Sequence, residues 1–430
     1  MDLSFILPIL VSGTGLYFLV RLRFFFILHP IRTARRLVAA LCERGARRSL
    51  SLALAGTLGV GNIFGVAMGI IIGGAGSVFW LLASSVFSAV IKYAEATLTL
   101  DLDRGEGGGM ASVIRATYPR GGAFFSKVYA VLCLILALVM GSAIQSDSVS
   151  EVVEATLGIQ PYLVALILAF LVGVTVFGGA QKIASVTEIV IPLTTLIYII
   201  MSFATIFVNR ERLGDVVSQI FFSAFSLPAA SGGAVAVLFS RAMREGYARG
   251  ILSNEAGAGT SAMAHETSGA DPATAGLFGI CEVFFDTPLL CTLTAVSILS
   301  AVSSPSDYTS AMALVADAFC TSLGTAAIFP LVFCVLAFAY STVVCWYYYG
   351  SECTRYLTGR EMRWLYAPAF LTFIFVGALA DSFLTLAVTD LVLLLMSLLT
   401  LAALVTVSPR LVELTVLGGL LKEKNSRRRD

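Results

Sequence analysis

Charged side chains are scarce in this sequence. Lys, Arg, Asp and Glu make up 13% of its 430 residues, whereas hydrophobic residues make up 58% and the mean hydropathy is +0.90. Soluble domains are about 25% charged, so a soluble enzyme of this size has too few charges to cover so much apolar surface. Disordered, collagen-like and coiled-coil proteins are excluded for the same reason. The composition predicts an all-helical integral membrane protein that crosses the bilayer many times.

Residues that hold metals or carry out covalent chemistry are also few. The sequence has two histidines and eight cysteines, with no CxxC pair. We interpret the cysteines as small core residues. No Walker motif, nucleophile elbow or HExxH motif occurs, and the glycines at 107–109 lack the strand, helix and Lys of a phosphate loop. We therefore expect no catalytic residue, no cofactor and no enzymatic activity.

Apolar runs long enough to cross a bilayer occur eleven times. They cover residues 3–20, 52–72, 78–99, 128–148, 160–180, 184–207, 220–240, 276–302, 324–349, 364–380 and 383–407. The first run is followed by Arg21 instead of a cleavage site of small residues. We therefore expect it to remain as a helix.

The basic residues predict the orientation of these helices. If residues 21–48 lie in the cytoplasm, 25 of the 28 Lys and Arg residues fall on that side and two, Arg210 and Arg212, on the other. Such a bias is the positive-inside signal, and it argues against a nucleic-acid patch. The sequence predicts a multi-pass protein of the plasma membrane, with its N-terminus outside and its C-terminus cytoplasmic.

Two of the eleven runs contain residues that interrupt helices. Residues 56–62 hold three glycines with Thr57 and Asn62, and residues 226–233 hold Pro228 with two glycines. Glycine costs about 1 kcal/mol and proline about 3 kcal/mol in a helix interior, and unpaired backbone is tolerated at membrane depth only beside protein or a water cavity. We expect both segments to line a cavity; the alternative is that the glycines only permit close helix packing.

The positions of the two interruptions predict an inverted repeat. If residues 1–50 form a peripheral helix and a basic loop, ten helices remain in two sets of five, at 51–207 and 214–407, with a basic tail at 408–430. Helices 2 and 7, the broken ones, then open the two sets from opposite sides of the membrane. This is the arrangement of transporters with a midplane site between two broken helices.

Several ionisable and hydroxyl side chains lie within the predicted spans, where they are costly and often functional. Lys92 and Glu95 are expected to form a structural ion pair on one helix face. Asp286 either makes helix-packing hydrogen bonds or serves a cation. Ser341 and Thr342 either bond to their own helix or face the cavity, with Trp346 on the same face as Thr342.

Several stretches resemble the alanine or glycine:cation symporter family. They are Ala53 to Ile63, Phe79-Trp80, Lys92 to Ala96, Arg249 to Gly257, Ala264-His265, Phe285 to Thr287, and Ser341-Thr342 with Trp346, Tyr348, Tyr349 and Gly350. The resemblance covers nearly the whole chain. It implies a LeuT-type fold with one extra N-terminal helix, and sodium-coupled uptake of alanine or glycine across the bilayer.

The same resemblance implies a set of binding residues. The small neutral amino acid would bind around Thr57, Gly59, Val60, Gly61 and Asn62, and the pocket would be closed by Gln145, Phe225, Ser226, Ala229, Ser231 and Gly232. Sodium would lie between the carbonyls of Ala55 and Leu58 and the hydroxyls of Ser341 and Thr342. Trp346 would restrict the substrate to a small side chain.

Three alternatives stay open at this point. A proton-coupled or metal-ion transporter would need a carboxylate in the cavity, for which Asp286 and Asp147 are the candidates. A membrane-embedded enzyme would need paired catalytic groups at one depth. A channel would more often show repeated pore loops.

Overall fold

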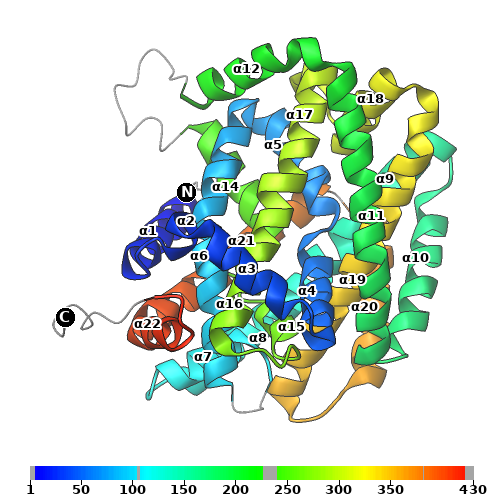
Figure 1. The fold of residues 1–430 in the computed structure, drawn as a ribbon. Coiled ribbons are helices and arrows are strands. Elements are labelled where there is room, and N and C mark those ends of the chain that lie inside the picture. The colour runs from blue at the N-terminus through cyan, green and yellow to red at the C-terminus, as the bar shows by residue number, and fades with distance from the viewer. Residues whose placement is uncertain (1–4, 104–106, 226–239, 381, 422–430) are drawn as a thin grey trace.

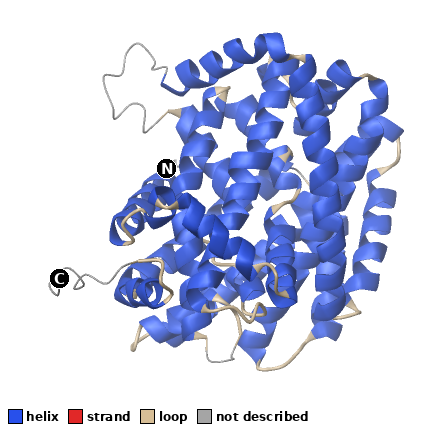
Figure 2. Cartoon of the chain, viewed as in Figure 1, coloured by secondary structure: helices blue, strands red, loops and turns tan. Residues whose placement is uncertain are grey.

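Helices account for the regular structure throughout the described part of the chain, which contains no strand (Figure 2). The computed structural model describes residues 5–103, 107–225, 240–380 and 382–421. The first half contains α1 (Ile6–Arg21), α2 (Phe25–Leu28), α3 (Pro30–Ala40), α4 (Arg44–Thr57), α5 (Phe64–Gly73), α6 (Gly76–Leu102), α7 (Met110–Thr117), α8 (Gly122–Leu138), α9 (Gln145–Leu157), α10 (Pro161–Val176), α11 (Ala180–Val208) and α12 (Leu213–Phe225).

The second half is also helical (Figure 1). It contains α14 (Arg241–Asn254), α15 (Ala262–His265), α16 (Pro272–Phe284), α17 (Thr292–Ala301), α18 (Ala311–Leu323), α19 (Ile328–Thr358), α20 (Arg363–Ala378), α21 (Ser382–Thr406) and α22 (Ser408–Leu417). The short helices are the 3₁₀ turns η1 (Val60–Asn62), η3 (Arg210–Arg212), η5 (Pro305–Asp307) and η6 (Thr325–Ala327), and the π-helical η2 (Val139–Ile144) and η4 (Phe285–Cys291).

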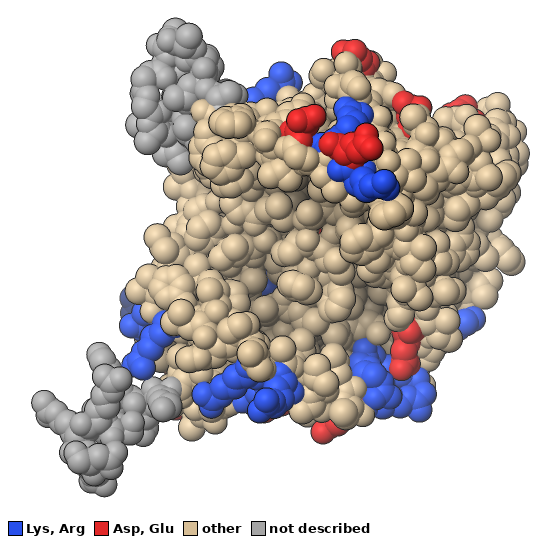
Figure 3. Space-filling model, turned by 45° about the horizontal axis from the view of Figure 1, so that its top comes forward, with Lys and Arg blue, Asp and Glu red and all other residues tan. Residues whose placement is uncertain are grey.

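Six helical stretches of the described chain are long and apolar enough to cross a membrane individually. They are 76–102, 122–157, 180–208, 272–301, 325–358 and 383–406, and the bent pair 44–57 with 60–73 adds a seventh. Four shorter apolar helices, α1, α10, α18 and α20, accompany them. Large apolar side chains such as Phe170, Ile189 and Phe203 are more than half exposed. Charged side chains gather near the two ends of the molecule, with an uncharged zone between them (Figure 3).

The long helix α6 packs closely against both α14 and α16 because small residues face it. A Cβ at Gly246 would lie 2.4 Å from the Ser77 carbonyl oxygen, and one at Gly279 would lie 2.8 Å from the Lys92 carbonyl oxygen. Without a strong hydrophobic drive between helices in lipid, such close backbone approach stabilises the packing. α6 therefore holds α14 and α16 near the broken helix α4–α5.

The helix predicted over 220–240 lies only partly within the described part of the chain. Residues 220–225 end α12, and residues 226–239 lie outside the described part of the chain. The helix that packs beside α5 and α6 is α14, which begins at Arg241. It ends at Asn254 and is followed, after a non-helical segment at 255–261, by the short α15. Within the described residues, α14–α15 is thus a second interrupted helix, whereas the interruption predicted at 226–233 lies outside them.

The position of α14 also differs from the sequence prediction for three arginines, which the prediction placed in the cytoplasm. The start of α14 lies at the turn between α5 and α6, because a Cβ at Gly73 would lie 2.9 Å from the Cβ of Glu245. We call the end of the molecule that holds residues 21–48 the basic end. Arg241 and Arg244 therefore lie at the opposite end. Arg249 is buried and pairs with Asp390 at 2.6 Å. Hydropathy predicts no membrane span over α14 because it counts these charges without their partners.

Candidate functional site at the broken helix

The first interrupted helix breaks where the sequence predicts. α4 ends at Thr57, η1 follows, and α5 starts at Phe64 after a bend of 56°. A Cβ at Gly59 would lie 2.5 Å from the Thr342 Oγ1 and 3.3 Å from the Gln145 Oε1, so only glycine fits there. The break therefore brings bare backbone up to α19 and α9.

A side chain from α9 and one from the break itself replace helical hydrogen bonds that the break removes. The Val60 amide donates to the Gln145 Oε1 at 3.2 Å, and the Gly59 amide donates to the Asn62 Oδ1 at 3.1 Å. Gln145 directly follows the π-helical η2, and π-helical turns are frequent at functional sites. The unwound backbone is thus held by specific partners, as irregular backbone at membrane depth requires.

A small pocket lies against this segment. Its lining residues in the described chain are Gly56, Thr57, Gly59, Gly61, Phe64, Met140, Ile144, Gln145, Leu252, Ser253 and Thr342. Its volume of about 10 Å³ admits about one water molecule. In this closed arrangement a bound solute larger than water requires the walls to move apart.

Asn62 connects the break to the second π-helical segment. Its side-chain nitrogen donates to the Asp286 Oδ1 at 2.6 Å, and the Ser253 hydroxyl donates to the same oxygen at 2.8 Å. Thr287 donates to the Asp286 Oδ2 at 2.6 Å. Asp286 is buried in η4, where Pro288 interrupts the helical ladder. The carboxylate therefore links α14, η1 and η4, and one of its partners, Ser253, lines the pocket.

The predicted sodium ligands are only partly brought together. The Thr342 hydroxyl donates to the Ala55 carbonyl at 2.9 Å, so α19 contacts the last turn of α4. The Ser341 hydroxyl instead donates within its own helix, to the carbonyls of Ala337 and Phe338 at 2.8 and 2.9 Å. Leu58, the remaining predicted ligand, is buried beside the break.

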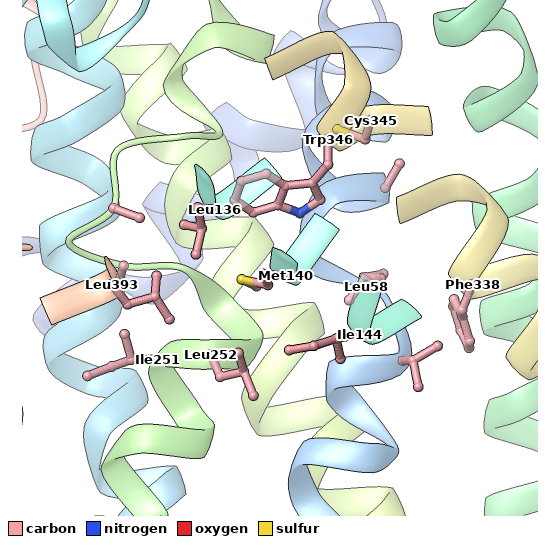
Figure 4. Close-up of a cluster of buried hydrophobic side chains, with 14 of the residues drawn as sticks. Leu58, Leu136, Met140, Ile144, Ile251, Leu252, Phe338, Cys345, Trp346 and Leu393 are labelled. Carbon is pink, nitrogen blue, oxygen red and sulfur yellow. The ribbon is translucent and has the colours of Figure 1, made fainter. Parts of the chain in front are cut away.

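Trp346 lies one turn beyond Thr342 and is buried, but it is not among the described residues that line the pocket. In Figure 4 its indole points toward Leu136 and Met140. A Cβ at Gly141 would lie 2.3 Å from the Trp346 Cβ, so this tryptophan packs tightly on η2. Met140 forms the pocket wall where the sequence predicted Trp346.

Of the predicted closing residues from 225 onward, only Phe225 lies in the described part of the chain. It does not line the pocket: it is 41% exposed and packs on Phe79 and Trp80 at the end of the molecule opposite the basic end. Ser226, Ala229, Ser231 and Gly232 lie outside the described residues. Leu252 and Ser253 of α14 also line the pocket, although the sequence analysis did not predict them. The signal for them was the Arg249 to Gly257 stretch, which lies between two of the predicted spans.

The predicted pair between Lys92 and Glu95 is also corrected. The Lys92 ammonium pairs with Glu282 on α16 at 3.3 Å and donates to the Ser261 hydroxyl at 2.7 Å. Glu95 accepts from the Gly257 amide at 2.8 Å. The helix spacing permitted the local pair, but tertiary packing supplied a closer partner. Asp147 is half-buried in α9, on the helix that carries Gln145.

A bundle of apolar helices with two interrupted helices, one of them broken at a small pocket, is typical of membrane transporters. Its arrangement is similar to that of a Na⁺-coupled sialic acid symporter, with a TM-score of 0.54 over 95% of this chain and 85% of that one, at 10% identity. The sequence pattern of the sodium:alanine symporter family matches residues 2–422, and the chain belongs to that family.

Among the relatives with descriptive names are two that are named for alanine. The sodium/alanine symporter AgcS of Methanococcus maripaludis is 32% identical, over 87% of this chain and 85% of that protein. The sodium/proton-dependent alanine carrier protein of a Bacillus species is 30% identical, over 74% of each chain.

Proposed function

We propose that this protein is a secondary active symporter that couples inward sodium flux to the uptake of a small neutral amino acid, alanine or glycine, by alternating access. The observation that carries the proposal is the break at residues 58–63, where glycine backbone, Gln145, Ser253 and Thr342 meet at one small pocket. Membership in the sodium:alanine symporter family and the names of the two relatives support the choice of alanine and sodium.

The chemistry of the pocket suits an amino acid. The N-terminal end of a helix offers amide groups and a positive dipole end to a carboxylate, and α5 starts directly after the break. The hydroxyls of Thr57 and Ser253 and the amide of Gln145 can bond the polar groups of the substrate. Walls of glycine, Met140 and Ile144 leave space for a methyl group after modest opening, which favours small side chains.

The contact between α19 and α4 supports a sodium site. Na⁺ prefers several oxygen ligands, as other hard cations do. The Thr342 hydroxyl and the Ala55 carbonyl already lie 2.9 Å apart. A rotation of the Ser341 hydroxyl away from its own helix would add a third oxygen. Ion binding at this point would brace α19 against the broken helix.

The alternative coupling ion is a proton carried by Asp286, or by Asp147. The burial of Asp286 and its contact with Asn62 favour Asp286 over Asp147 within this alternative.

We also propose eleven membrane crossings. They comprise the six long spans, the bent pair α4–α5, the shorter helices α1, α10 and α20, and the interrupted pair α14–α15. The two interrupted helices then run in opposite directions, which supports two inverted sets of five helices within 51–207 and 214–407. With the basic end in the cytoplasm, the N-terminus lies outside the cell and the tail at 408–430 lies on the cytoplasmic side of the plasma membrane.

Uptake into proteoliposomes tests the function. We expect radiolabelled alanine to accumulate under an inward sodium gradient, and unlabelled alanine or glycine to compete more strongly than leucine. The control is an equal gradient of choline. Accumulation driven by a proton gradient without sodium would move the coupling to the proton alternative. A failure of alanine and glycine to compete for any transported solute would overturn the substrate proposal.

A further inference from the structure

A chain of buried polar groups lies between the pocket and the basic end. Its centre is His265 on α15, whose Nδ1 lies 3.0 Å from the Ser49 hydroxyl on α4 and whose Nε2 bonds a carboxylate oxygen of Glu282 on α16. All three side chains are completely buried. Ser49 precedes Gly56 of the pocket by two helical turns, about 10 Å. The network is thus separate from the proposed amino-acid and sodium sites.

The network continues through the other oxygen of Glu282. Lys92 of α6 pairs with that oxygen at 3.3 Å and donates to Ser261, the last residue of the non-helical segment after α14. One continuous chain of contacts therefore joins α4, α15, α16, α6 and the segment at 255–261. Two of these elements, α4 and α15, belong to the two interrupted helices.

Three buried carboxyl groups lie around the Lys92 ammonium in this network. Glu95 and Glu255 are completely buried, and both lie near Lys92 in addition to Glu282. Glu95 accepts from the Gly257 amide, and Glu255 accepts from the Thr260 hydroxyl. The polar groups that pack around α15 come from every neighbouring element: Ser49 (α4), Lys92 and Glu95 (α6), Glu255, Thr260 and Ser261 (the segment after α14), Glu282 (α16) and Tyr348 (α19). Arg48, next to Ser49, pairs instead with Glu188 of α11 at 3.0 Å.

The hydrogen-bond partners of His265 fit both charge states of the imidazole. With a neutral ring, Nε2–H donates to Glu282 and the Ser49 hydroxyl donates to Nδ1. After a proton from water binds to Nδ1, the new N–H donates to the Ser49 oxygen, whose hydroxyl turns away. A serine hydroxyl can donate or accept, so neither state leaves a buried nitrogen unpaired. A bonding partner fixed as a donor, such as a backbone amide, would allow only one of these states.

We propose that His265, paired with Glu282, is a proton-binding site whose occupancy is linked to the opening of the basic end. The inference deepens the proposed symport, on which it rests, by adding a bound proton at a place distinct from Asp286. Opening requires α4 to separate from α15, which breaks the contact between Ser49 and His265 and admits water to the ring. The proton then exchanges with the solution at that end. A ligand shifts such an equilibrium only if it binds the two states differently, and the loss of the Ser49 contact supplies that difference.

The chain offers a matched control because it has only one other histidine, His29, which is exposed. In proteoliposomes that contain a pH-sensitive dye, we expect alanine uptake by the wild type and by His29→Gln to acidify the lumen. His265→Gln should move at least tenfold fewer protons per alanine while sodium-driven uptake persists. Equal proton movement per alanine in His265→Gln, or none in the wild type while sodium-driven uptake is intact, would overturn the proposal. An absence of alanine uptake under every gradient would instead overturn the proposed function.

A second measurement does not depend on transport or on the folding of His265→Gln. In His29→Gln protein labelled with ¹⁵N-histidine, all imidazole signals come from His265. We expect these signals to show both the neutral and the protonated ring as the pH is varied, and Ser49→Ala to change the proportion of the two forms. A ring that keeps one charge state across the whole range would contradict the proposal.

Discussion

At the scale of single residues, Asn62 carries two roles in the break. Its oxygen accepts from the Gly59 amide and its nitrogen donates to Asp286, both while buried. The residue therefore holds the shape of the broken segment and ties it to η4. Neither role is visible from the one-dimensional spacing of the glycines.

Replacing Asn62 by leucine tests these roles. The change leaves the Gly59 amide and the Asp286 carboxylate each without one partner, at about 1–3 kcal/mol per group. We expect Asn62→Leu to abolish amino-acid binding, as measured by scintillation proximity with labelled alanine. Ser253→Ala removes one donor to Asp286 and one hydroxyl of the pocket but leaves the Gly59 amide paired, so it should weaken binding less. Wild-type affinity in Asn62→Leu protein of equal abundance would show that the residue has no part in the site.

The size of the substrate side chain is a second question at this scale. Met140 lines the pocket, whereas Trp346 packs behind it on Gly141 and Tyr349. We expect Met140→Ala to let valine and leucine compete with alanine uptake. Trp346→Ala should mainly lower the free energy of unfolding, by about 3–5 kcal/mol, as for other large buried side chains. A broadened competition profile in Trp346→Ala alone would place the indole at the substrate after all.

At the scale of helices, the packing of α14 on α6 depends on the space at Gly246. A methyl group there would meet backbone atoms, the Ser77 carbonyl oxygen at 2.4 Å and the Leu81 amide nitrogen at 2.9 Å. Backbone cannot rotate away as a side chain can. We expect Gly246→Ala to destabilise the protein by about 1–3 kcal/mol, although alanine is the better helix former.

The measurement is thermal unfolding in detergent, with Gly214→Ala as the control. Gly214 lies in α12 with no atom within 4 Å of an added Cβ, so alanine there should be neutral or stabilising. A melting temperature of Gly246→Ala equal to that of Gly214→Ala would show that α14 can move away from α6 at no cost.

The start of α16 supplies a pH-dependent contact at the basic end. The Asp271 carboxylate caps the helix through the Thr274 amide and pairs with Arg36 of α3 at 3.1 Å. Burial alone would raise the pKa of Asp271, but the bonds from Thr274 and the charge of Arg36 together lower that pKa below its usual value. The contact is therefore stabilising above about pH 3.9, the ordinary value for aspartate. Its contribution is lost as the pH falls through the lowered pKa.

We expect Asp271→Asn to be less stable than the wild type at neutral pH and equally stable at the acid end of the titration. Asparagine keeps an N-cap oxygen but removes the charge, so the difference isolates the pair with Arg36. Thermal unfolding measured in steps of pH checks this, with Asp215→Asn as a control away from the basic end. A stability difference that does not change with pH would assign the effect to capping alone.

At the scale of the whole molecule, sodium coupling needs a contact that forms in one state of the transport cycle. The Thr342 hydroxyl reaches the Ala55 carbonyl on the broken helix, whereas the Ser341 hydroxyl bonds within α19. We expect Thr342→Val to raise the sodium concentration for half-maximal uptake by tenfold or more, about 1.4 kcal/mol per decade. Ser341→Ala should have a smaller effect.

Alanine binding at saturating sodium should change little in either variant, because linkage acts through the ion. An unchanged sodium dependence in the double variant Ser341→Ala, Thr342→Val would place the coupling ion elsewhere, with Asp286 the first position to examine.

The sequence predicted the local features of the site better than its tertiary partners. Three glycines with Thr57 and Asn62 predicted the break at 56–62, because the helix propensity of a segment depends on the segment alone. The partner of Lys92 was predicted wrongly, since helix spacing offers Glu95 while the ion pair forms with Glu282, 190 residues away. The wall residues Met140 and Leu252 are ordinary apolar residues in the sequence, so only their placement marks them.

The sequence by itself determined that the chain is a helical membrane protein, where the first helix breaks, and which family it resembles. Each of these follows from composition or from residues adjacent in the chain. Tertiary structure decided where the second interrupted helix lies. α14 contains Arg241, Arg244, Glu245 and Arg249 and therefore looks too polar to enter a membrane, whereas residues 220–240 look apolar. In the fold, Arg249 pairs with Asp390 and Glu245, and a buried charge is tolerated when a partner from elsewhere in the chain meets it.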